Sequence, residues 1–278
     1  MKKGWFSTFL LIIILLIGLS LILYPSFSNY WNDLHQTKAI ADYSAKIARL
    51  NEEDYSAIWQ SAKDYNASLL RRDNRYKLTE EQKERYEQEL NVAENGVMGY
   101  VEIPQIDVFL PIYHGTSEPV LQVAIGHIDW SSLPVGGEST HCVVSGHRGL
   151  PSAKLFTDLD KVTEGDTFMI NILDEVLTYE VDQIKIVEPY DTEALLIEEG
   201  KDYCTLVTCT PYGVNSHRML VRGVRTENAK ETRNIRVTAD AIQIEPLMVA
   251  PMIAAPMLLV LLIMLLLPKT KKNRRRKS

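Results

Sequence analysis

The amino-acid sequence predicts a mainly β protein in which a closed β-barrel or a β-sandwich follows a layer of helices and lies between two transmembrane helices. Three observations lead to this fold class. Short strand-like segments, separated by turns rich in Gly, Pro, Asn and Asp, fill residues 94–228. Residues 25–93 are polar and contain apolar positions at helical spacing. Long apolar runs lie at residues 6–24 and 247–267, near the two ends of the 278-residue chain.

Residues 1–24 are predicted to form a transmembrane anchor or a signal. Phe6 to Tyr24 is an almost uninterrupted apolar run, with Lys2 and Lys3 in front of it. A helix of that length spans roughly 28 Å, which is enough to cross the hydrocarbon core of a bilayer. A cleaved signal peptide usually ends in a small-x-small site, whereas this run ends in Tyr-Pro-Ser. We therefore favour an uncleaved anchor.

Residues 247–267 are predicted to form a second transmembrane helix, followed by a basic cytoplasmic tail at 268–278. The run contains two prolines, which a membrane helix tolerates as kinks. Seven Lys and Arg residues follow it, and such an excess holds a helix end in the cytoplasm. The N-terminal lysines favour the same side. The sequence therefore predicts a two-pass protein of the cell membrane with both termini cytoplasmic, a linker at 229–246 and residues 25–245 outside the cell.

The charge distribution supports this division. The chain has 30 Lys and Arg, 36 Asp and Glu, and a formal net charge of −6. Nine of the 30 cations and none of the acids lie in the two apolar ends, which leaves 21 cations against 36 acids, a net charge of −15, for the exterior part. Nucleic-acid binding requires a basic footprint, so we exclude nucleic acid as a partner. An acidic surface would attract a lysine-rich protein, although solubility explains it equally well.

The polar region at residues 25–93 is predicted to be helical. Within Asp33–Leu50, apolar side chains recur at helical spacing. Thr79–Leu90 is a second helical stretch, because Thr79 and Gln82 have the spacing of a capping box. These helices are expected to pack on the rest of the exterior domain as a satellite layer.

The predicted β domain extends over residues 94–228. Its segments are short, and turns such as Leu133–Gly137 and Glu164–Asp166 separate them. The predicted strands are Val101–Ile103, Ile106–Ile112, Cys142–Ser145, Phe168–Leu173, Thr178–Ile186, Thr205–Thr208 and Met219–Val224. Strands at this spacing are typical of a closed barrel or a sandwich.

Cys209 is the candidate nucleophile of this domain. It ends a β-branched segment that begins at Cys204 and leads into the turn Pro211–Gly213, so its sulfur would be presented at the rim of a sheet. Arg218 returns nine residues after Cys209 on the next predicted strand. A cation there would stabilise the negative charge that forms during acyl transfer. The alternative is that Cys209 is a small buried hydrophobe, as a lone cysteine in a strand often is.

The other cysteines do not form a disulfide framework with Cys209. Cys204 and Cys209 are five residues apart in one predicted strand, so they point to opposite faces and cannot bridge each other. A bridge between Cys142 and Cys204 remains open. At least one thiol is left over, and a free thiol outside a cell calls for a reason.

His147 is the candidate partner of the thiol among the six histidines. It lies in Ser145–Gly149, at the exit of a predicted strand and between two glycines, which permit a sharp turn and a close approach by another segment. His217 is the local alternative. It precedes Arg218, and in a strand the two would point to opposite faces, so only one of them would face the thiol. A metal site of His and Cys is disfavoured, because the sequence has no Cys-x-x-Cys or His-x-x-x-His pair.

Together these segments resemble the sortases, and specifically the pilin-polymerising class C sortases of Gram-positive bacteria. The resemblance covers roughly residues 95–225, and the N-terminal helices and the C-terminal span look like that class too. Its most specific motif is Thr205–Cys209 with a downstream arginine. The other matching segments are Met98–Pro104, Ser132–His141, Ser145–Pro151, Leu155–Leu159 and the continuation of the cysteine motif to Gly213.

The resemblance implies an eight-stranded sortase barrel in which His147, Cys209 and Arg218 converge. It implies that Cys209 attacks the Thr–Gly bond of an LPxTG-like sorting signal on a pilin or surface protein. Protonated His147 would then donate to the departing amine, and a lysine amine of another pilin would resolve the thioester. Arg218 would hydrogen-bond the substrate carbonyl or the oxyanion. Thr208 is a candidate support of the substrate site, and neither metal nor cofactor is required.

Class C sortases commonly carry a lid with Asp, Pro and an aromatic residue over the active site. The corresponding region here, about residues 73–76, reads Asp73-Asn74-Arg75-Tyr76, which lacks the proline and places the aromatic one position late. We expect either a modified lid, with Asp73 near Arg218 or Tyr76 over Cys209, or an ordinary turn between helices.

Three other functions remain open. A sortase that anchors proteins to the cell wall would use the same chemistry with a peptidoglycan-precursor amine as acceptor. A papain-like hydrolase would let water take the acyl group, although such proteases place the cysteine early and on a helix. A non-enzymatic barrel would leave Cys209 inert.

Overall fold

The computed structural model describes residues 3–72 and 76–228. Residues up to Tyr30 belong to a different compact unit from the one that begins at Trp31, and all the strands lie in the second unit. The predicted linker, C-terminal span and basic tail, together with Asp73, lie outside the described residues.

The N-terminal apolar run is part of a longer helix than the sequence predicted. Helix α1 extends over Lys3–Ile47 and contains Pro25, where the predicted span ended. Proline removes one backbone donor, but an apolar membrane helix tolerates that loss. Within the described residues, Phe9–Ile47 is the single helix long and apolar enough to cross a membrane, by length and composition. The helix therefore continues from the predicted span at residues 1–24 into the predicted helical region at residues 25–93.

Two further helices complete the N-terminal layer. Helix α2 covers Glu52–Leu69 and begins at Asn51, whose side chain accepts from the Asp54 amide. Helix α3 covers Glu80–Gln88, and the capping box between Thr79 and Gln82 is confirmed.

These helices are attached to the β domain by buried polar contacts. The Tyr43 hydroxyl of α1 accepts from the Leu173 amide at 2.7 Å. The Asn66 side chain of α2 donates to and accepts from the backbone of Leu133, at 3.1 and 2.7 Å. The Tyr86 hydroxyl of α3 donates to the His127 carbonyl at 3.1 Å. Buried hydrogen bonds of this kind specify one docking position as well as stabilising it, so the predicted satellite layer is confirmed.

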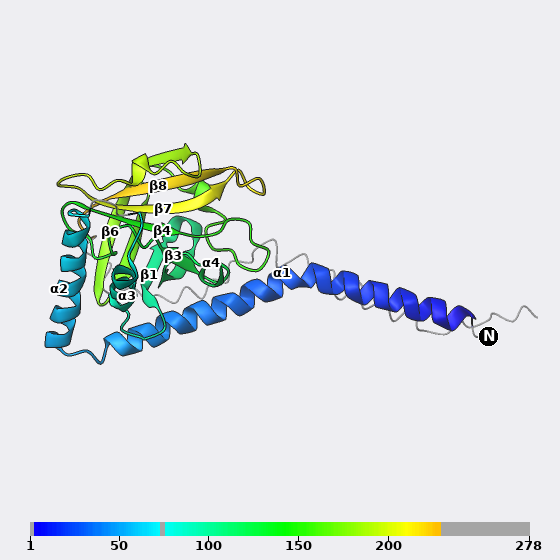
Figure 1. Ribbon diagram of the computed structural model, residues 1–278. Coiled ribbons are helices and arrows are strands. Elements are labelled where there is room, and N and C mark those ends of the chain that lie inside the picture. Colours follow the sequence, from blue (N-terminus) through cyan, green and yellow to red (C-terminus); the bar gives the residue numbers. More distant parts are fainter. Residues whose placement is uncertain (1–2, 73–75, 229–278) are drawn as a thin grey trace, which may run out of the picture. The chain divides into compact units, whose positions relative to one another are not determined.

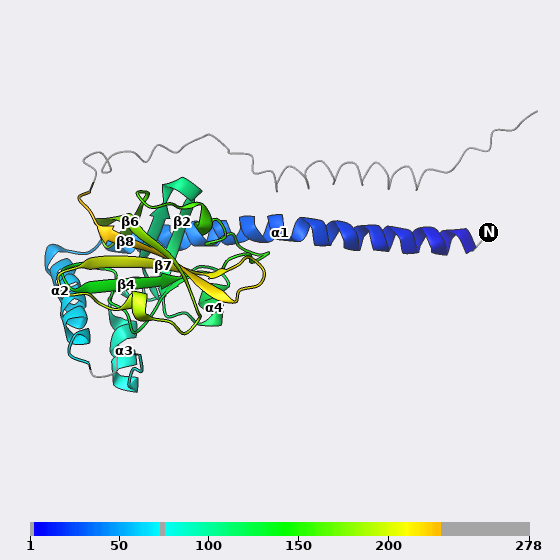
Figure 2. The same cartoon turned by 90° about the horizontal axis from the view of Figure 1, so that it is seen from above.

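The β domain is a closed eight-stranded barrel with the strand order β1-β2-β3-β4-β7-β8-β6-β5 (Figures 1 and 2). Its strands are β1 Val97–Ile103, β2 Val108–His114, β3 Ile125–His127, β4 Thr140–Ser145, β5 Thr167–Ile172, β6 Glu175–Val187, β7 Asp202–Thr210 and β8 His217–Arg225. A short helix α4, Glu118–Leu121, and 3-10 turns at Pro104–Ile106, Leu159–Lys161 and Glu193–Leu195 lie in the connections. Closure decides between the barrel and the sandwich that the sequence left open.

Strand β3 was not predicted from the sequence. It has three residues, one of them glycine, so it carries no alternating pattern. It pairs parallel with β2 and antiparallel with β4, and β4 in turn pairs parallel with β7. This parallel β4–β7 pair brings the exits of two strands to the same end of the barrel.

The alternation along β7 gives its two faces different roles. Cys204 and Leu206 point into the main core of the barrel. Val207 points the other way and belongs to a second apolar cluster, in which β4, β7 and β8 each supply a residue. We call it the outer cluster; its buried members are Val143, Leu195, Val207 and Leu220, with Ile128, Trp130, Val187 and Ala194 packed against them.

Candidate active site

Cys209 and Arg218 are direct neighbours across two antiparallel strands. Cys209 lies at the end of β7 and Arg218 near the start of β8, and the two are Cα partners in the ladder. Directly opposite side chains project from the same face of a sheet with Cβ atoms about 5 Å apart. Cys209 is a free thiol and is partly exposed, unlike the other two cysteines. The thiol is therefore presented at the sheet rim beside a cation, as the sequence predicted.

His147 reaches the same rim from the neighbouring strand. Strand β4 ends at Ser145, which pairs with Val207 of β7. The chain continues beside β7 for another residue, because the Gly146 amide donates to the Val207 carbonyl at 3.0 Å. His147 is two residues beyond Ser145, and Cys209 is two residues beyond its partner Val207. In a parallel pair His147 is therefore level with Cys209. The structure brings the three predicted residues to the same end of β4, β7 and β8.

Thr208 supports this arrangement from inside the barrel. Its side chain is almost fully buried, and its hydroxyl donates to the Gly146 carbonyl at 2.8 Å. The Phe156 amide donates to the His147 carbonyl at 3.1 Å and holds the next peptide. Thr208 therefore fixes the backbone that leads into His147.

The Arg218 guanidinium turns back onto the connection between β7 and β8. It donates to the carbonyls of Asn215 and His217, at 3.3 and 3.1 Å. His217, the alternative partner of the thiol, pairs with Thr210 in the ladder, and its ring lies 3.3 Å from Glu188 and 2.8 Å from the Ser216 hydroxyl. Because His217 and Arg218 alternate along β8, Arg218 is the one on the Cys209 face.

The outer cluster lies on the same face as the thiol. Val207 precedes Cys209 by two residues on β7, and Leu220 follows Arg218 by two on β8. Leu195 reaches the cluster from the β6–β7 loop, residues 188–201, and Trp130 from the segment after β3. A buried apolar cluster thus continues from the candidate nucleophile along the sheet.

Tyr76 touches this surface from the N-terminal region. Its ring meets that of Trp130 edge-on, with centroids 5.1 Å apart, and the Thr192 hydroxyl donates to the Tyr76 hydroxyl at 3.3 Å. Tyr76 is 48% exposed. It therefore lies over Trp130 at the edge of the outer cluster, next to the β6–β7 loop.

The other two thiols lie inside the barrel. Cys142 and Cys204 are Cα partners in the parallel β4–β7 pair, and both are free and buried. Burial raises the pKa of the Cys204 thiol well above its ordinary value, because a thiolate is poorly solvated in an apolar core. This thiol is thus unsuited to nucleophilic attack, and the bridge that the sequence left open is not formed.

The described part of the chain contains no candidate metal centre. Among residues 3–72 and 76–228, no group of three or more His, Cys, Asp or Glu side chains is arranged to hold a metal ion.

Sequence reasoning missed the members of the outer cluster that come from loops. The positions of Val207 and Leu220 could have been predicted, because both residues alternate with core residues along their strands. No sequence pattern predicts the positions of Trp130 and Leu195, because these depend on how two loops fold over the sheet.

Comparison with known proteins agrees with this geometry. Residues 101–226 match the sortase domain family. The crystal structure of sortase C1 from Streptococcus agalactiae is 51% identical and superposes with a TM-score of 0.68, over 69% of this chain and 100% of that one. Clostridium perfringens sortase C, solved with the C-terminal cell wall sorting motif, is 41% identical with a TM-score of 0.60, over 69% of this chain and 100% of that one. Sortase D of Bacillus subtilis is 32% identical over 130 residues, which span 46% of this chain and 63% of that protein.

A closed eight-stranded barrel of this order, with a thiol and an arginine paired at one rim, defines a cysteine transpeptidase of the sortase type. The chain belongs to the sortase family and, within it, to the class C sortases.

Proposed function

We propose that this protein cleaves an LPxTG-like sorting signal between Thr and Gly and transfers the acyl group to a lysine amine of a pilin. The observation that carries the proposal is the pairing of Cys209 with Arg218 on the face of the outer cluster, with His147 level with the thiol. A nucleophile, a proton donor and a fixed cation then surround one scissile amide.

In the first half-reaction the Cys209 thiolate attacks the threonine carbonyl carbon. The carbonyl oxygen gains negative charge, and the C–N bond to glycine breaks as protonated His147 gives its proton to the leaving amine. A thioester on Cys209 results. In the second half-reaction a lysine amine attacks this thioester and neutral His147 takes its proton. The thiolate leaves, and one amide has replaced another without any change of oxidation state.

Arg218 stabilises the charge on the carbonyl oxygen in this scheme. Its Nη1 donates to the Asn215 and His217 carbonyls, so substrate that used this nitrogen would draw the guanidinium away from the loop. The planar fork of arginine donates two parallel hydrogen bonds and keeps its charge, and lysine reproduces neither property.

The leucine and proline of the signal would bind at the edge of the outer cluster, where its partly buried members Trp130 and Ile128 lie. The cluster lies along the strands that end at the nucleophile, where the residues preceding the scissile bond would rest. Burial of an apolar side chain contributes roughly 25 cal/mol per Å². The structure of Clostridium perfringens sortase C with its sorting motif shows that a relative takes such a ligand.

The acceptor and the topology complete the proposal. We infer a two-pass membrane protein, with spans at 1–24 and 247–267, both termini cytoplasmic and the barrel of residues 94–228 outside. The apolar character of α1 supports the first span; the basic tail at 268–278 supports the second. Similarity to sortase C of Streptococcus pneumoniae, whose crystal structure bears on pilin substrate specificity, supports pilin as the substrate.

We also propose that Tyr76 belongs to a lid together with Asp73. The contact of Tyr76 with Trp130 supports this, because Trp130 packs on the outer cluster beside the nucleophile. Replacing Asp73 and Tyr76 by Ala should speed alkylation of Cys209 by iodoacetamide. Tyr190→Ala, at a tyrosine 95% exposed on the neighbouring loop, is the control. An unchanged alkylation rate in the double variant would indicate that residues 73–76 form an ordinary turn between helices and not a lid.

The decisive experiment mixes the full-length protein in detergent micelles with a sorting-signal peptide and an amine. Mass spectrometry should find the peptide acyl group on Cys209, and the amine should then remove it as a new amide. Cys209→Ala is the control for the adduct. Steady cleavage unaffected by the amine would indicate a hydrolase, and an unreactive thiol would indicate a scaffold. In cells, single wall-linked proteins instead of covalent pilin ladders would indicate the wall-anchoring alternative.

A further inference from the structure

The β6–β7 loop, residues 188–201, covers part of the outer cluster and is attached to the barrel by both apolar and polar contacts. Leu195 of this loop is buried against Val207, two residues before Cys209. Leu196 is 41% exposed, whereas Ala194 is partly buried against the same cluster and Ile197 is partly buried against the main core. The position of Leu195 on the sheet therefore depends on whatever fixes the neighbouring backbone.

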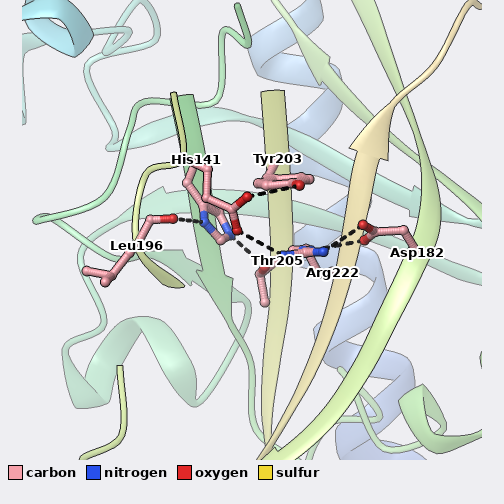
Figure 3. A network of polar contacts seen from close by, with 7 residues as sticks. His141, Asp182, Leu196, Tyr203, Thr205 and Arg222 are labelled. Atoms are coloured by element: carbon pink, nitrogen blue, oxygen red, sulfur yellow. Dashed lines mark hydrogen bonds and ion pairs between the residues drawn. The ribbon is translucent and has the colours of Figure 1, made fainter. Parts of the chain in front are cut away.

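His141 of β4 provides that attachment (Figure 3). Its Nδ1 lies 2.9 Å from the Leu196 carbonyl oxygen and its Nε2 lies 2.7 Å from the Thr205 hydroxyl. A carbonyl only accepts, so Nδ1 carries the hydrogen and donates to the loop. In the neutral ring Nε2 then accepts from Thr205. His141 is 1% exposed, so these bonds do not exchange readily with water.

The far end of the loop has a second, weaker attachment. Arg222 of β8 is held by both carboxylate oxygens of Asp182, at 3.0 and 2.7 Å. From there it reaches Glu198 of the loop at 3.5 Å, and its guanidinium lies 4.1 Å from the centroid of the Tyr203 ring. Glu198 is exposed, and ion pairs at exposed positions contribute little. The buried bond from His141 is the stronger constraint on Leu195.

We propose that His141 is a positioning residue that sets the affinity for the sorting signal by fixing the β6–β7 loop against the sheet. This inference rests on the proposed function. Because Leu195 adjoins Leu196, the bond to the Leu196 carbonyl decides where the loop meets the outer cluster. His141 lies on the same face of β4 as Val143 of the outer cluster, far enough along the strand that it has no part in the chemical step. Its loss therefore raises KM and leaves kcat and the reactivity of Cys209 unchanged.

Two amide variants separate the two hydrogen bonds. The side-chain amide of Asn reaches the position of Nδ1, so His141→Asn keeps the hydrogen bond to the Leu196 carbonyl and loses the one with the Thr205 hydroxyl. The side-chain amide of Gln reaches the position of Nε2, so His141→Gln keeps the hydrogen bond with the Thr205 hydroxyl and loses the one to the Leu196 carbonyl. His35→Gln, at an exposed histidine bonded to the carbonyl four residues before it, is the control for an unrelated His-to-Gln change.

The measurements are peptide turnover by the full-length protein, iodoacetamide labelling of Cys209, and cleavage of the native protein by a glutamyl endopeptidase. The protease reports on the loop directly, because Glu193, Glu198 and Glu199 are exposed within it. His141→Gln should raise KM about tenfold, as expected for one buried hydrogen bond. It should also speed proteolysis in the loop, with kcat and labelling unchanged. His141→Asn and His35→Gln should behave as the wild type.

Wild-type KM and proteolysis in His141→Gln would overturn the proposal, as would equal losses in His141→Asn and His141→Gln. If no peptide turns over, proteolysis alone decides, so the loop attachment can stand while the proposed function falls. If His141→Gln does not fold, Leu195→Ala releases the same loop without altering the sheet. An unchanged KM in that variant would also overturn the proposal.

Discussion

Gly146→Ala offers a test of how the barrel positions His147. Gly146 lies between the end of β4 and His147, where an added side chain would meet buried neighbours. A Cβ at this position would lie 2.8 Å from Ile125 Cγ2 and 2.8 Å from Phe156 Cδ2. Ile125 and Phe156 are fully buried and belong to the main core, so neither can yield without disturbing its neighbours.

The expected effect has two parts. Adding a methyl group to a closely packed core destabilises a protein by about 1–3 kcal/mol. The backbone can relieve the contact by moving outward, and it carries His147 with it. A displacement of about 1 Å at a catalytic group can lower the rate about 100-fold. We therefore expect a fall of that order in the kcat/KM of peptide cleavage, with most protein still folded.

Gly223→Ala is the matched control. A Cβ on Gly223 of β8 would lie 2.7 Å from Phe168 Cε1 and 2.8 Å from Tyr179 Cβ, so the overpacking is similar. Gly223 pairs with Cys204, five residues from Cys209 and roughly 16 Å along the strand. The assay combines urea unfolding with initial rates at a temperature where both variants are folded.

The comparison separates positioning from stability. Both variants should lose a similar free energy of unfolding, and only Gly146→Ala should lose activity beyond its loss of folded protein. Equal activity in the two variants would refute the reasoning. So would full activity in Gly146→Ala despite a measured loss of stability.

Three further predictions follow from the site and its support. Arg218→Lys should lower the rate of thioester formation about 100-fold or more, because one fixed donor to the oxyanion is lost, as followed by rapid-quench mass spectrometry. Tyr43→Phe should lower the free energy of unfolding by about 1–3 kcal/mol in urea, because the buried Leu173 amide loses its acceptor. Burial raises the pKa of Asp202, so the folded state binds this proton more tightly than the unfolded state. Its contribution is fully present below the unfolded pKa, about 4, and is lost as pH rises through the folded pKa. The stability of the wild type relative to Asp202→Asn should therefore fall as pH rises from about 4.

Each of these has its own contrary result. Thioester formation at the wild-type rate in Arg218→Lys would remove the role given to the guanidinium. A Tyr43→Phe change within about 0.5 kcal/mol of wild type would place α1 outside the cooperative unit. A stability difference between wild type and Asp202→Asn that is independent of pH would mean that the carboxyl has the same pKa folded and unfolded.

Part of the candidate site could be predicted from local sequence patterns alone. Cys209 and Arg218 come from adjacent strands joined by a short turn, so their pairing follows from strand alternation and the length of that turn. The capping box at Thr79 is local for the same reason. His147 is separated from Cys209 by about 60 residues, and its place beside the thiol follows from the parallel β4–β7 pairing, which no local pattern encodes.

The sequence by itself determined the mainly β character, the N-terminal helical layer, the apolar first helix and the candidate nucleophile, because periodicity, caps and apolar length depend on neighbouring residues. The tertiary structure alone decided the closure of the barrel, the three-residue strand β3, the burial of Thr208 and the attachment of the β6–β7 loop to His141. These features depend on pairing between segments distant in the chain. Such pairing is selected by the packing of the whole core, which local patterns do not specify.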